Sequence, residues 1–251
     1  YIGGGTPTSI SADELEELIL FINEFCPERK EFTCEAGRPD SITKEKLFKM
    51  KKAGIDRISI NPQTMNDDTL QRIGRNHTSS QIIESFNLAR SLGFNNINMD
   101  MIIGLPGENM NHITNTVKEI IRLKPENVTV HTMTIKRASI YKETPNIIDN
   151  NESIDKTMDY TRNAFETINM QPYYLYRQKF MVQNLENIGY CKKNFECIYN
   201  IQIMEEKQSI IAFGADAVTK VIFPDENRIE RQHNIKDLKL YIERIDEQIE
   251  K

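Results

Sequence analysis

The chain has 251 residues, enough for one α/β barrel-like domain or two smaller units with a sizeable core. Its 32 basic and 37 acidic side chains leave a net charge of −5, which argues against a general attraction to nucleic acid or anionic membranes. No apolar run reaches the roughly 20 residues that span a bilayer, and the first residues lack the pattern of a secretion signal. We therefore expect a monomeric cytoplasmic protein whose partners are small molecules or other proteins.

The cysteines do not have the spacing of a metal loop. Seven residues separate Cys26 from Cys34, and five separate Cys191 from Cys197. Nor do the four histidines have the spacing of a zinc site. We expect most of these cysteines to be buried thiols. Because the chain opens without methionine on an apolar and glycine-rich run, we also expect the native protein to contain residues before Tyr1.

Up to about residue 133 the sequence repeats one order: a short β-branched run, a turn, then a stretch with helical periodicity. This order is typical of βα units with a parallel sheet, and five successive strands indicate a barrel or part of one. Ser11 with Glu14, and Thr43, are the predicted helix caps. The predicted strands are residues 1–5, 31–36, 57–61, 96–103 and 127–133. The predicted helices follow Ser11, Thr43 and the turn at 104–107, with two more at 67–73 and 80–92.

The second half of the chain follows a different pattern. Residues 136–151 lack periodicity, which predicts a long connection over a site. The sequence then predicts a helix at 153–169, short strands at 173–176, 198–205, 209–213 and 218–222, and a final helix at 235–249. We therefore expect a partial barrel over residues 1–150, and a barrel-closing helix with a small α+β region over residues 151–251.

Ligands of open α/β sheets and barrels gather at the carboxyl ends of the strands, so the residues there are the candidates for a site. The candidates are Gly3, Gly4, Gly5, Thr6, Glu35, Gln63, Arg75, Asp100, Ile102 and Gly104. A glycine run lets a ligand approach the backbone, or simply permits a tight turn at positive φ. The carboxylates either bind a ligand or pair with Arg57 or Arg75. Gln63 suits a ribose edge or stabilises a turn, and Arg75 either binds a carboxylate as a fork or is a solvated surface side chain.

Apolar and aromatic candidates also have two interpretations. Ile102 and its neighbours either flank a planar ring or belong to the core. The tyrosine-rich run at residues 173–176 either faces a large aromatic ligand or packs at the rim. His77 and His131 lie near element ends, and we interpret both as ordinary hydrogen-bonded histidines.

The order and spacing of these motifs resemble the oxygen-independent coproporphyrinogen III oxidase family of radical S-adenosylmethionine enzymes. The resemblance is close over the first half of the chain. It weakens over residues 130–139 and 173–190, which are similar to a branch often called coproporphyrinogen dehydrogenase-like. The motifs are Tyr-Ile-Gly-Gly-Gly-Thr-Pro-Thr at residues 1–8, Glu35, Arg-Ile-Ser-Ile-Asn-Pro-Gln at 57–63, Gly-Arg-Asn-His at 74–77 and Asn-Met-Asp-Met-Ile-Ile-Gly-Leu-Pro-Gly at 98–107.

The resemblance implies an incomplete (β/α)6 barrel that lacks its first βα unit, with S-adenosylmethionine as cofactor. The cofactor's amino group would meet Gly3 to Gly5 with Thr6 nearby, and Arg75 would pair with its carboxylate. Gln63 and Asp100 match positions near the ribose hydroxyls. Glu35 matches a position near the cofactor. The backbone around Ile102 and Gly104 matches a position that flanks adenine.

The implied reaction is the oxidative decarboxylation of coproporphyrinogen III to protoporphyrinogen IX in haem biosynthesis. In the family a reduced 4Fe-4S cluster releases a 5′-deoxyadenosyl radical from S-adenosylmethionine, and that radical removes hydrogen from a propionate. An electron donor and an electron acceptor would be partners. The alternatives are a relative that binds or delivers haem and a radical enzyme that methylates a tetrapyrrole.

The chain departs from this family at the cluster. The family's cluster ligands are spaced Cys-x3-Cys-x2-Cys upstream of the glycine run, and no cysteines of this chain have that spacing. Either the cluster ligands lie upstream of Tyr1 or the protein has lost the cluster and its chemistry. The missing methionine favours the first, and we expect no catalytic activity from these 251 residues alone.

If Arg75 pairs with the carboxylate of S-adenosylmethionine, its removal should weaken cofactor binding. We expect Arg75→Ala, in the protein that carries the cluster, to cost about 1.5–3 kcal/mol of binding free energy, the range for hydrogen bonds to charged groups. Isothermal titration calorimetry measures this change. An unchanged dissociation constant would remove Arg75 from the site.

Overall fold

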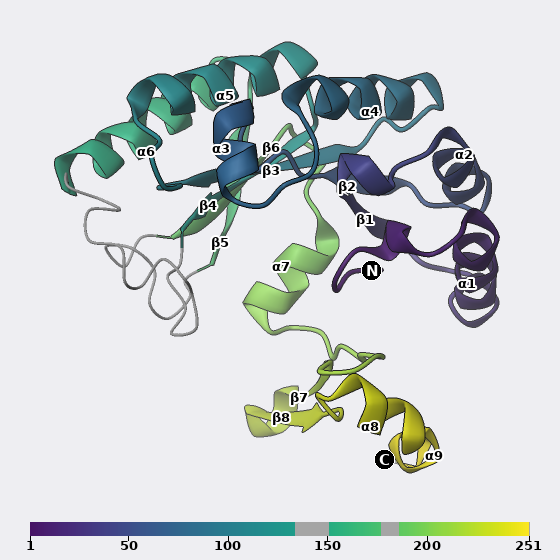
Figure 1. The fold of residues 1–251 in the computed structure, drawn as a ribbon. Helices are drawn as coiled ribbons and strands as arrows, with labels where there is room; N and C mark the ends of the chain where they lie inside the picture. Colours follow the sequence, from purple (N-terminus) through teal and green to yellow (C-terminus); the bar gives the residue numbers. More distant parts are fainter. Residues whose placement is uncertain (134–150, 177–185, 251) are drawn as a thin grey trace. The chain divides into compact units, whose positions relative to one another are not determined.

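A computed structural model describes residues 1–133, 151–176 and 186–250, and these form two units (Figure 1). The first unit is Tyr1–Cys197 and the second is Ile198–Lys251. This division differs from the predicted boundary at residue 150, because residues 151–176 and 187–191 belong to the helices and the sheet of the first unit. The predicted connection at 136–151 lies almost entirely outside the described residues.

The first unit is a mixed α/β structure built on a six-stranded sheet. The order of its strands is β1-β2-β3-β4-β6-β5. The strands are β1 (Thr33–Gly37), β2 (Arg57–Ile60), β3 (Ile97–Ile103), β4 (Asn127–Thr132), β5 (Gln171–Tyr176) and β6 (Asn187–Cys191). The helices are α1 (Ala12–Phe25), α2 (Lys44–Lys52), α3 (Asp67–Arg72), α4 (Ser79–Ser91), α5 (Met110–Leu123) and α6 (Asn151–Glu166).

Strands β1 to β4 are parallel neighbours in chain order, as the βα rhythm predicted. The connection from β2 to β3 holds two helices, α3 and α4, which is also as predicted. The predicted strand at residues 1–5 is reduced to one parallel bridge, between Ile2 and Cys34. Strand β6 is antiparallel to both β4 and β5, so the sheet does not continue as a purely parallel barrel.

Alternation along the parallel strands gives the sheet two different faces. One face is apolar and lies in the hydrophobic core with the helices, which cover this side of the curved sheet in Figure 1. The apolar residues are Cys34 and Ala36 of β1, Ile58 and Ile60 of β2, Met99, Met101 and Ile103 of β3, and Val128 and Val130 of β4. The intervening residues point to the opposite, inner face, and most of them are polar.

The predicted helix starts are confirmed in detail. Ser11 and Glu14 form a reciprocal capping box at the start of α1, and the Thr43 side chain accepts a hydrogen bond from the Lys46 amide at the start of α2. A second capping box, formed by Thr78 and Gln81, begins α4. These caps satisfy amide groups that have no partner within the helix.

The second unit contains a small antiparallel sheet of two strands and three short helices. Its elements are α7 (Ile198–Glu205), β7 (Val218–Phe223), β8 (Arg228–His233), α8 (Leu238–Glu243) and α9 (Ile245–Ile249), with a single turn of 3-10 helix, η5 (Pro224–Glu226), between β7 and β8. Strands β7 and β8 pair in register from Val218 opposite His233 to Phe223 opposite Arg228.

Several predictions for this unit were wrong. Residues 198–205 form the helix α7 and not a strand, because no neighbouring strand pairs with them. Residues 209–213 contribute only one bridge, between Ile210 and Lys220. The predicted final helix is two helices that meet at Arg244, whose φ of −116° and ψ of 32° are not helical.

None of the helices in the described residues combines the length and apolar character needed to cross a membrane.

Two neighbouring residues of α1, one buried and one exposed, provide a matched test of the fold. Ile19 is 0% exposed in the core, whereas its neighbour Leu20 is 48% exposed. We expect Ile19→Ala to lower the free energy of unfolding by about 2–5 kcal/mol, because it leaves a cavity in the core. Leu20→Ala should change it by less than about 1 kcal/mol. Urea denaturation of both variants measures the difference, and equal losses would contradict this packing of α1.

Candidate functional site

The inner face of the sheet is polar, and it becomes more accessible toward the carboxyl ends of the strands. On β3, Asn98 is 5% exposed, whereas Asp100 and Ile102 are partly exposed. On β4, Thr129 is buried and His131 is partly exposed. The same gradient runs from Thr33 to Glu35 on β1, and from Arg57 through Ser59 to Asn61 at the end of β2. The carboxyl edge is therefore where polar inner side chains meet solvent.

Hydrogen bonds connect these inner side chains across three strands. The Asn98 amide group donates to Ser59 Oγ over 2.8 Å and to Asp100 Oδ1 over 2.7 Å. Thr129 Oγ1 donates to Asn98 Oδ1 over 3.2 Å, and His131 Nε2 lies 3.7 Å from Asp100 Oδ2. Asn98 and Thr129 fix the Asp100 carboxylate on one side while His131 faces it on the other.

The charges of Asp100 and His131 stabilise each other. Burial alone would raise the pKa of Asp100, but His131, Asn98 and Thr129 together hold it below its ordinary value. Burial alone would lower the pKa of His131, but Asp100, with a further contribution from Glu35, raises it above its ordinary value. The pair therefore favours an ionised carboxylate beside a protonated imidazole.

Glu35 is the second carboxylate of the inner face. Its Oε1 accepts a hydrogen bond of 2.5 Å from the Tyr1 hydroxyl. Burial raises the pKa of Glu35, and the negative charge of Asp100 adds to this, while Tyr1, Arg57 and His131 oppose it. The two predicted carboxylates thus lie close enough to influence each other's ionisation.

An aromatic side chain borders the same face from β5. A Cβ atom on Gly189 would lie 1.8 Å from the Tyr174 ring, so only glycine on β6 lets that ring cross the strand. The Tyr174 hydroxyl then reaches Thr129 Oγ1 at 3.5 Å, and burial raises the pKa of Tyr174 to about 12. One member of the predicted tyrosine run therefore lies on the inner face.

Gln63 follows β2 at this edge with a φ of 65°, an uncommon conformation for a residue other than glycine. The Gln63 amide donates to the Asp100 carbonyl, and the Gln63 carbonyl accepts from the Ile102 amide, both over 2.9 Å. These bonds hold the unfavourable conformation beside Asp100. Backbone strain of this kind is concentrated at functional sites.

The sequence left two interpretations of the glycine run open, and each of them holds for some of the glycines. A Cβ atom on Gly3 would lie 2.9 Å from the Tyr1 ring, and Gly4 has a φ of 97°, so both have structural reasons to be glycine. Around Gly5 there is no atom within 4 Å of an added Cβ, and its φ does not require glycine. Gly5 therefore presents open backbone, as a ligand contact requires.

Thr6, Gly104 and Arg75 are the remaining predicted site residues. Thr6 precedes η1 (Pro7–Ser9) without a side-chain capping bond, and Gly104 ends β3 with a φ of 88°. Arg75 follows α3 and is partly buried near Arg38 and Asp40. The structure brings Glu35, Asp100 and Gln63 together, but within the described residues Arg75 forms no hydrogen bond or ion pair with those three.

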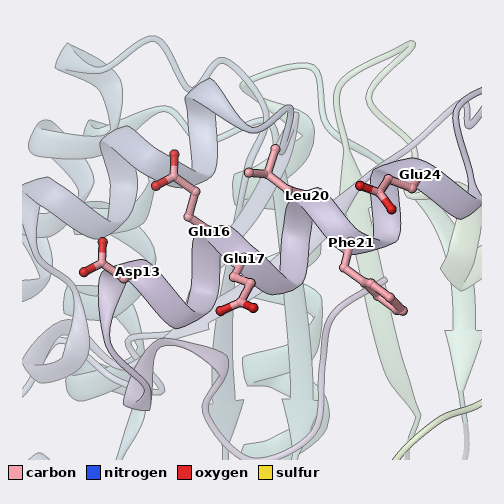
Figure 2. Close-up of a pocket in the computed structure, with 6 residues that line it drawn as sticks. All are labelled: Asp13, Glu16, Glu17, Leu20, Phe21 and Glu24. Atoms are coloured by element: carbon pink, nitrogen blue, oxygen red, sulfur yellow. The ribbon is translucent and has the colours of Figure 1, made fainter.

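A separate hollow lies along α1 and does not belong to this edge. Figure 2 shows its lining, in which every side chain comes from that one helix. The lining residues are Asp13, Glu16, Glu17, Leu20, Phe21 and Glu24. None of the predicted site residues lines it.

The described cysteines do not assemble a metal site. Cys34, Cys191 and Cys197 are buried and Cys26 is exposed. Within residues 1–133, 151–176 and 186–250 there is no group of three or more histidine, cysteine or acidic side chains that could hold a metal ion. These residues do not fit a three-cysteine cluster. The open backbone at Gly5 and the partly exposed carboxylates at the strand ends do fit a nucleoside with an amino-acid tail.

Sequence reasoning found the carboxylates but missed the network around them. The missed residues are Asn98 and Thr129. His131 was considered only as an ordinary histidine, and Tyr174 only as a member of the tyrosine run. The available signal was the alternation of polar with apolar residues along β3 and β4, where Asn98, Asp100, Thr129 and His131 occupy every second position.

Comparison with known proteins gives the class of this protein. The sequence pattern of the Radical SAM superfamily matches residues 1–120. Together with the relatives described next, this match supports a coproporphyrinogen-oxidase-like radical SAM family for the chain.

The relatives carry two different names. The chain is 46% identical to the oxygen-independent coproporphyrinogen-III oxidase-like protein HemZ of Bacillus subtilis, over 98% of this chain and 50% of HemZ. It is 37% identical to the heme chaperone HemW of the same organism, over 56% of this chain and 38% of HemW. The chain thus spans half or less of the length of these relatives.

A solved structure supports the fold. Coproporphyrinogen III oxidase HemN of Escherichia coli superposes with a TM-score of 0.75 and 19% identity, over 98% of this chain and 56% of HemN. The expected fold class, a partial radical SAM barrel followed by a small antiparallel sheet, is therefore confirmed.

The Asp100–His131 pair predicts a pH dependence of stability. Because the pKa of His131 is raised in the folded state, its contribution is complete below pH 6.5 and is lost as the pH rises through the higher folded-state value. We expect wild-type protein to lose stability above pH 6.5 and His131→Asn to lose less over the same interval. Urea denaturation at a series of pH values measures both. Parallel curves would show that the pair does not form.

Proposed function

We propose that this chain binds S-adenosylmethionine at the carboxyl edge of its parallel sheet, within an enzyme that decarboxylates coproporphyrinogen III to protoporphyrinogen IX. The observation that carries the proposal is the pair of carboxylates, Glu35 and Asp100, at the accessible end of a polar inner face. Beside them are the strained Gln63 backbone and the open backbone at Gly5.

Each proposed role follows from the chemistry of the residue. Asp100, whose lowered pKa keeps it ionised, accepts hydrogen bonds from the ribose hydroxyls, and Gln63 supports it. Gly5, with Thr6 nearby, gives the amino-acid part close access to backbone groups. Ile102 and Gly104 flank the adenine ring. Arg75 faces the cofactor's carboxylate, and Glu35 lies near its amino group.

When bound beside a reduced 4Fe-4S cluster, S-adenosylmethionine supplies a radical that removes hydrogen from an unactivated carbon. The described residues do not hold such a cluster, so the proposal places its ligands outside them. The part assigned to this chain is to bind the nucleotide, to orient it and to limit the access of water to the inner face.

The names of the relatives give two candidates for the function, because HemZ is a coproporphyrinogen-III oxidase-like protein and HemW is a heme chaperone. Identity to HemZ is 46% over 98% of this chain, whereas identity to the heme chaperone HemW is 37% over 56% for the Bacillus protein and 25% over 90% for that of Escherichia coli. The higher identity to HemZ favours the oxidase-like function. Delivery of haem is the second candidate.

Titration of the complete protein with haem and with coproporphyrinogen III separates the two candidates. We expect turnover of coproporphyrinogen III under anaerobic conditions, with a mass loss of two carboxyl groups as carbon dioxide and of four hydrogens in total, and weak binding of haem. Absorbance spectroscopy and mass spectrometry of the product measure these outcomes. Tight haem binding without a vinyl product would contradict the oxidase and favour haem delivery.

A further inference from the structure

Tyr1 lies on the inner face of the sheet beside Glu35. The Ile2 amide donates to the Thr33 carbonyl over 2.8 Å, and the Glu35 amide donates to the Ile2 carbonyl over 2.9 Å. Ile2 therefore pairs with β1, and its side chain packs against the core. Because side chains alternate along an extended chain, Tyr1 points to the same inner face as Glu35, and Gly3 lies on that face.

The absence of a side chain at Gly3 makes room for the Tyr1 ring. A Cβ atom on Gly3 would lie 2.9 Å from Cε1 of Tyr1 and 3.5 Å from the carboxyl carbon of Glu35. The ring therefore lies over the glycine, with the Glu35 carboxyl group next to it. The φ of Gly3 is not positive, so backbone conformation does not require glycine there. Any larger residue at this position would displace the ring and its hydroxyl.

One hydrogen bond fixes the Glu35 side chain. The Tyr1 hydroxyl donates to Oε1 of Glu35 over 2.5 Å, at the short end of the range for hydroxyl donors to carboxylates. Among the described residues, no other group forms a hydrogen bond or an ion pair with the Glu35 side chain. The orientation of this carboxyl group thus depends on Tyr1, and its second oxygen is accessible to a ligand.

The neighbouring charges do not orient Glu35 in the same way. Arg57, Asp100 and His131 act on Glu35 through charge alone. Desolvation raises the pKa of Glu35, and the bond from Tyr1 opposes this more strongly than Arg57 or His131 does. Desolvation and the charge of Glu35 raise the pKa of Tyr1, so the phenol keeps the proton that it donates. Tyr1 therefore favours an ionised carboxylate in one orientation.

We infer that Tyr1 is a positioning residue, whose hydroxyl holds the Glu35 carboxylate toward an ammonium group of the ligand and so sets a preference for ligands that carry one. A carboxylate that is already oriented loses less side-chain entropy when it binds a cation. Its hydrogen bond to an ammonium group is charge-assisted and is therefore among the stronger kinds. The choice of the α-amino group of S-adenosylmethionine as that ammonium group rests on the proposed function.

A double-mutant cycle tests the bond between Tyr1 and Glu35 without any ligand. We expect Tyr1→Phe and Glu35→Ala to be coupled by about tenfold in the unfolding equilibrium constant, because each removes one partner of a hydrogen bond to a charged group. Urea denaturation of the complete protein measures the coupling. Tyr160→Phe, which removes a hydroxyl from α6, is the matched control and should show no coupling with Glu35→Ala. Additive effects of Tyr1→Phe and Glu35→Ala would overturn the inference.

A pair of ligands tests the positioning role. Wild-type complete protein should prefer S-adenosylmethionine to its analogue without the α-amino group by about tenfold to a hundredfold, and Tyr1→Phe should lose most of that preference. The affinity of Tyr1→Phe for the analogue should equal that of wild type, and Tyr160→Phe should keep the full preference. Isothermal titration calorimetry measures all of these affinities. Equal weakening of both ligands in Tyr1→Phe would show a purely structural role and would contradict the inference.

Failure of the inference and failure of the proposed function give different results. Wild type that binds neither ligand contradicts the proposed function, and the double-mutant cycle then decides the Tyr1–Glu35 bond by itself. Wild type that binds both ligands equally, or Tyr1→Phe that keeps the preference of wild type, contradicts the inference alone.

Discussion

The alternation of the parallel strands is the constraint on which the rest of this structure depends. Every second residue of β2, β3 and β4 is apolar and buried under the helices, so the residues between them must face the other side of the sheet. Those residues are mostly polar, and at buried positions they must be hydrogen-bonded. The network that joins Ser59, Asn98, Thr129 and Asp100 meets this requirement. Core packing on one face thereby fixes the position of the polar groups on the other.

The fold was largely predictable wherever hydrophobic periodicity and caps agreed. The four parallel strands, the capping box at Ser11 and the double helix between β2 and β3 all carry strong local signals. Prediction failed where tertiary contacts decide the outcome. Gly189 lowers the strand propensity of the β6 sequence. Glycine is required at this position because the Tyr174 ring crosses the strand there. Strand β8 is mostly exposed and has little apolar alternation, so only its pairing with β7 identifies it.

Part of the candidate site could also be predicted from the sequence. Parallel strands place their carboxyl ends at one edge, so Glu35, Gln63 and Asp100 could be placed near one another from chain order alone. The partners of these residues could not be. That His131 pairs with Asp100, and that the Tyr1 hydroxyl donates to Glu35, depends on register and on loop paths that local sequence does not encode.

The described residues can form a nucleotide site but contain no metal centre. In the proposed function the carboxylates, Gln63 and the open backbone at Gly5 bind a nucleoside and its amino-acid tail, whereas Cys34, Cys191 and Cys197 are buried. Residues toward the amino ends of the strands, such as Arg57 and Asn127, are buried and belong to the interior of the sheet. The proposed site therefore lies at the carboxyl edge of the sheet.

A crystal structure of the protein with S-adenosylmethionine tests this central claim most directly. The account predicts that the ribose hydroxyls contact the Asp100 carboxylate, that the amino-acid part lies over Gly5, and that the adenine ring lies against the backbone near Ile102. A ligand bound elsewhere, such as the hollow along α1, or Asp100 fully enclosed by its own network without a ligand contact, would contradict it.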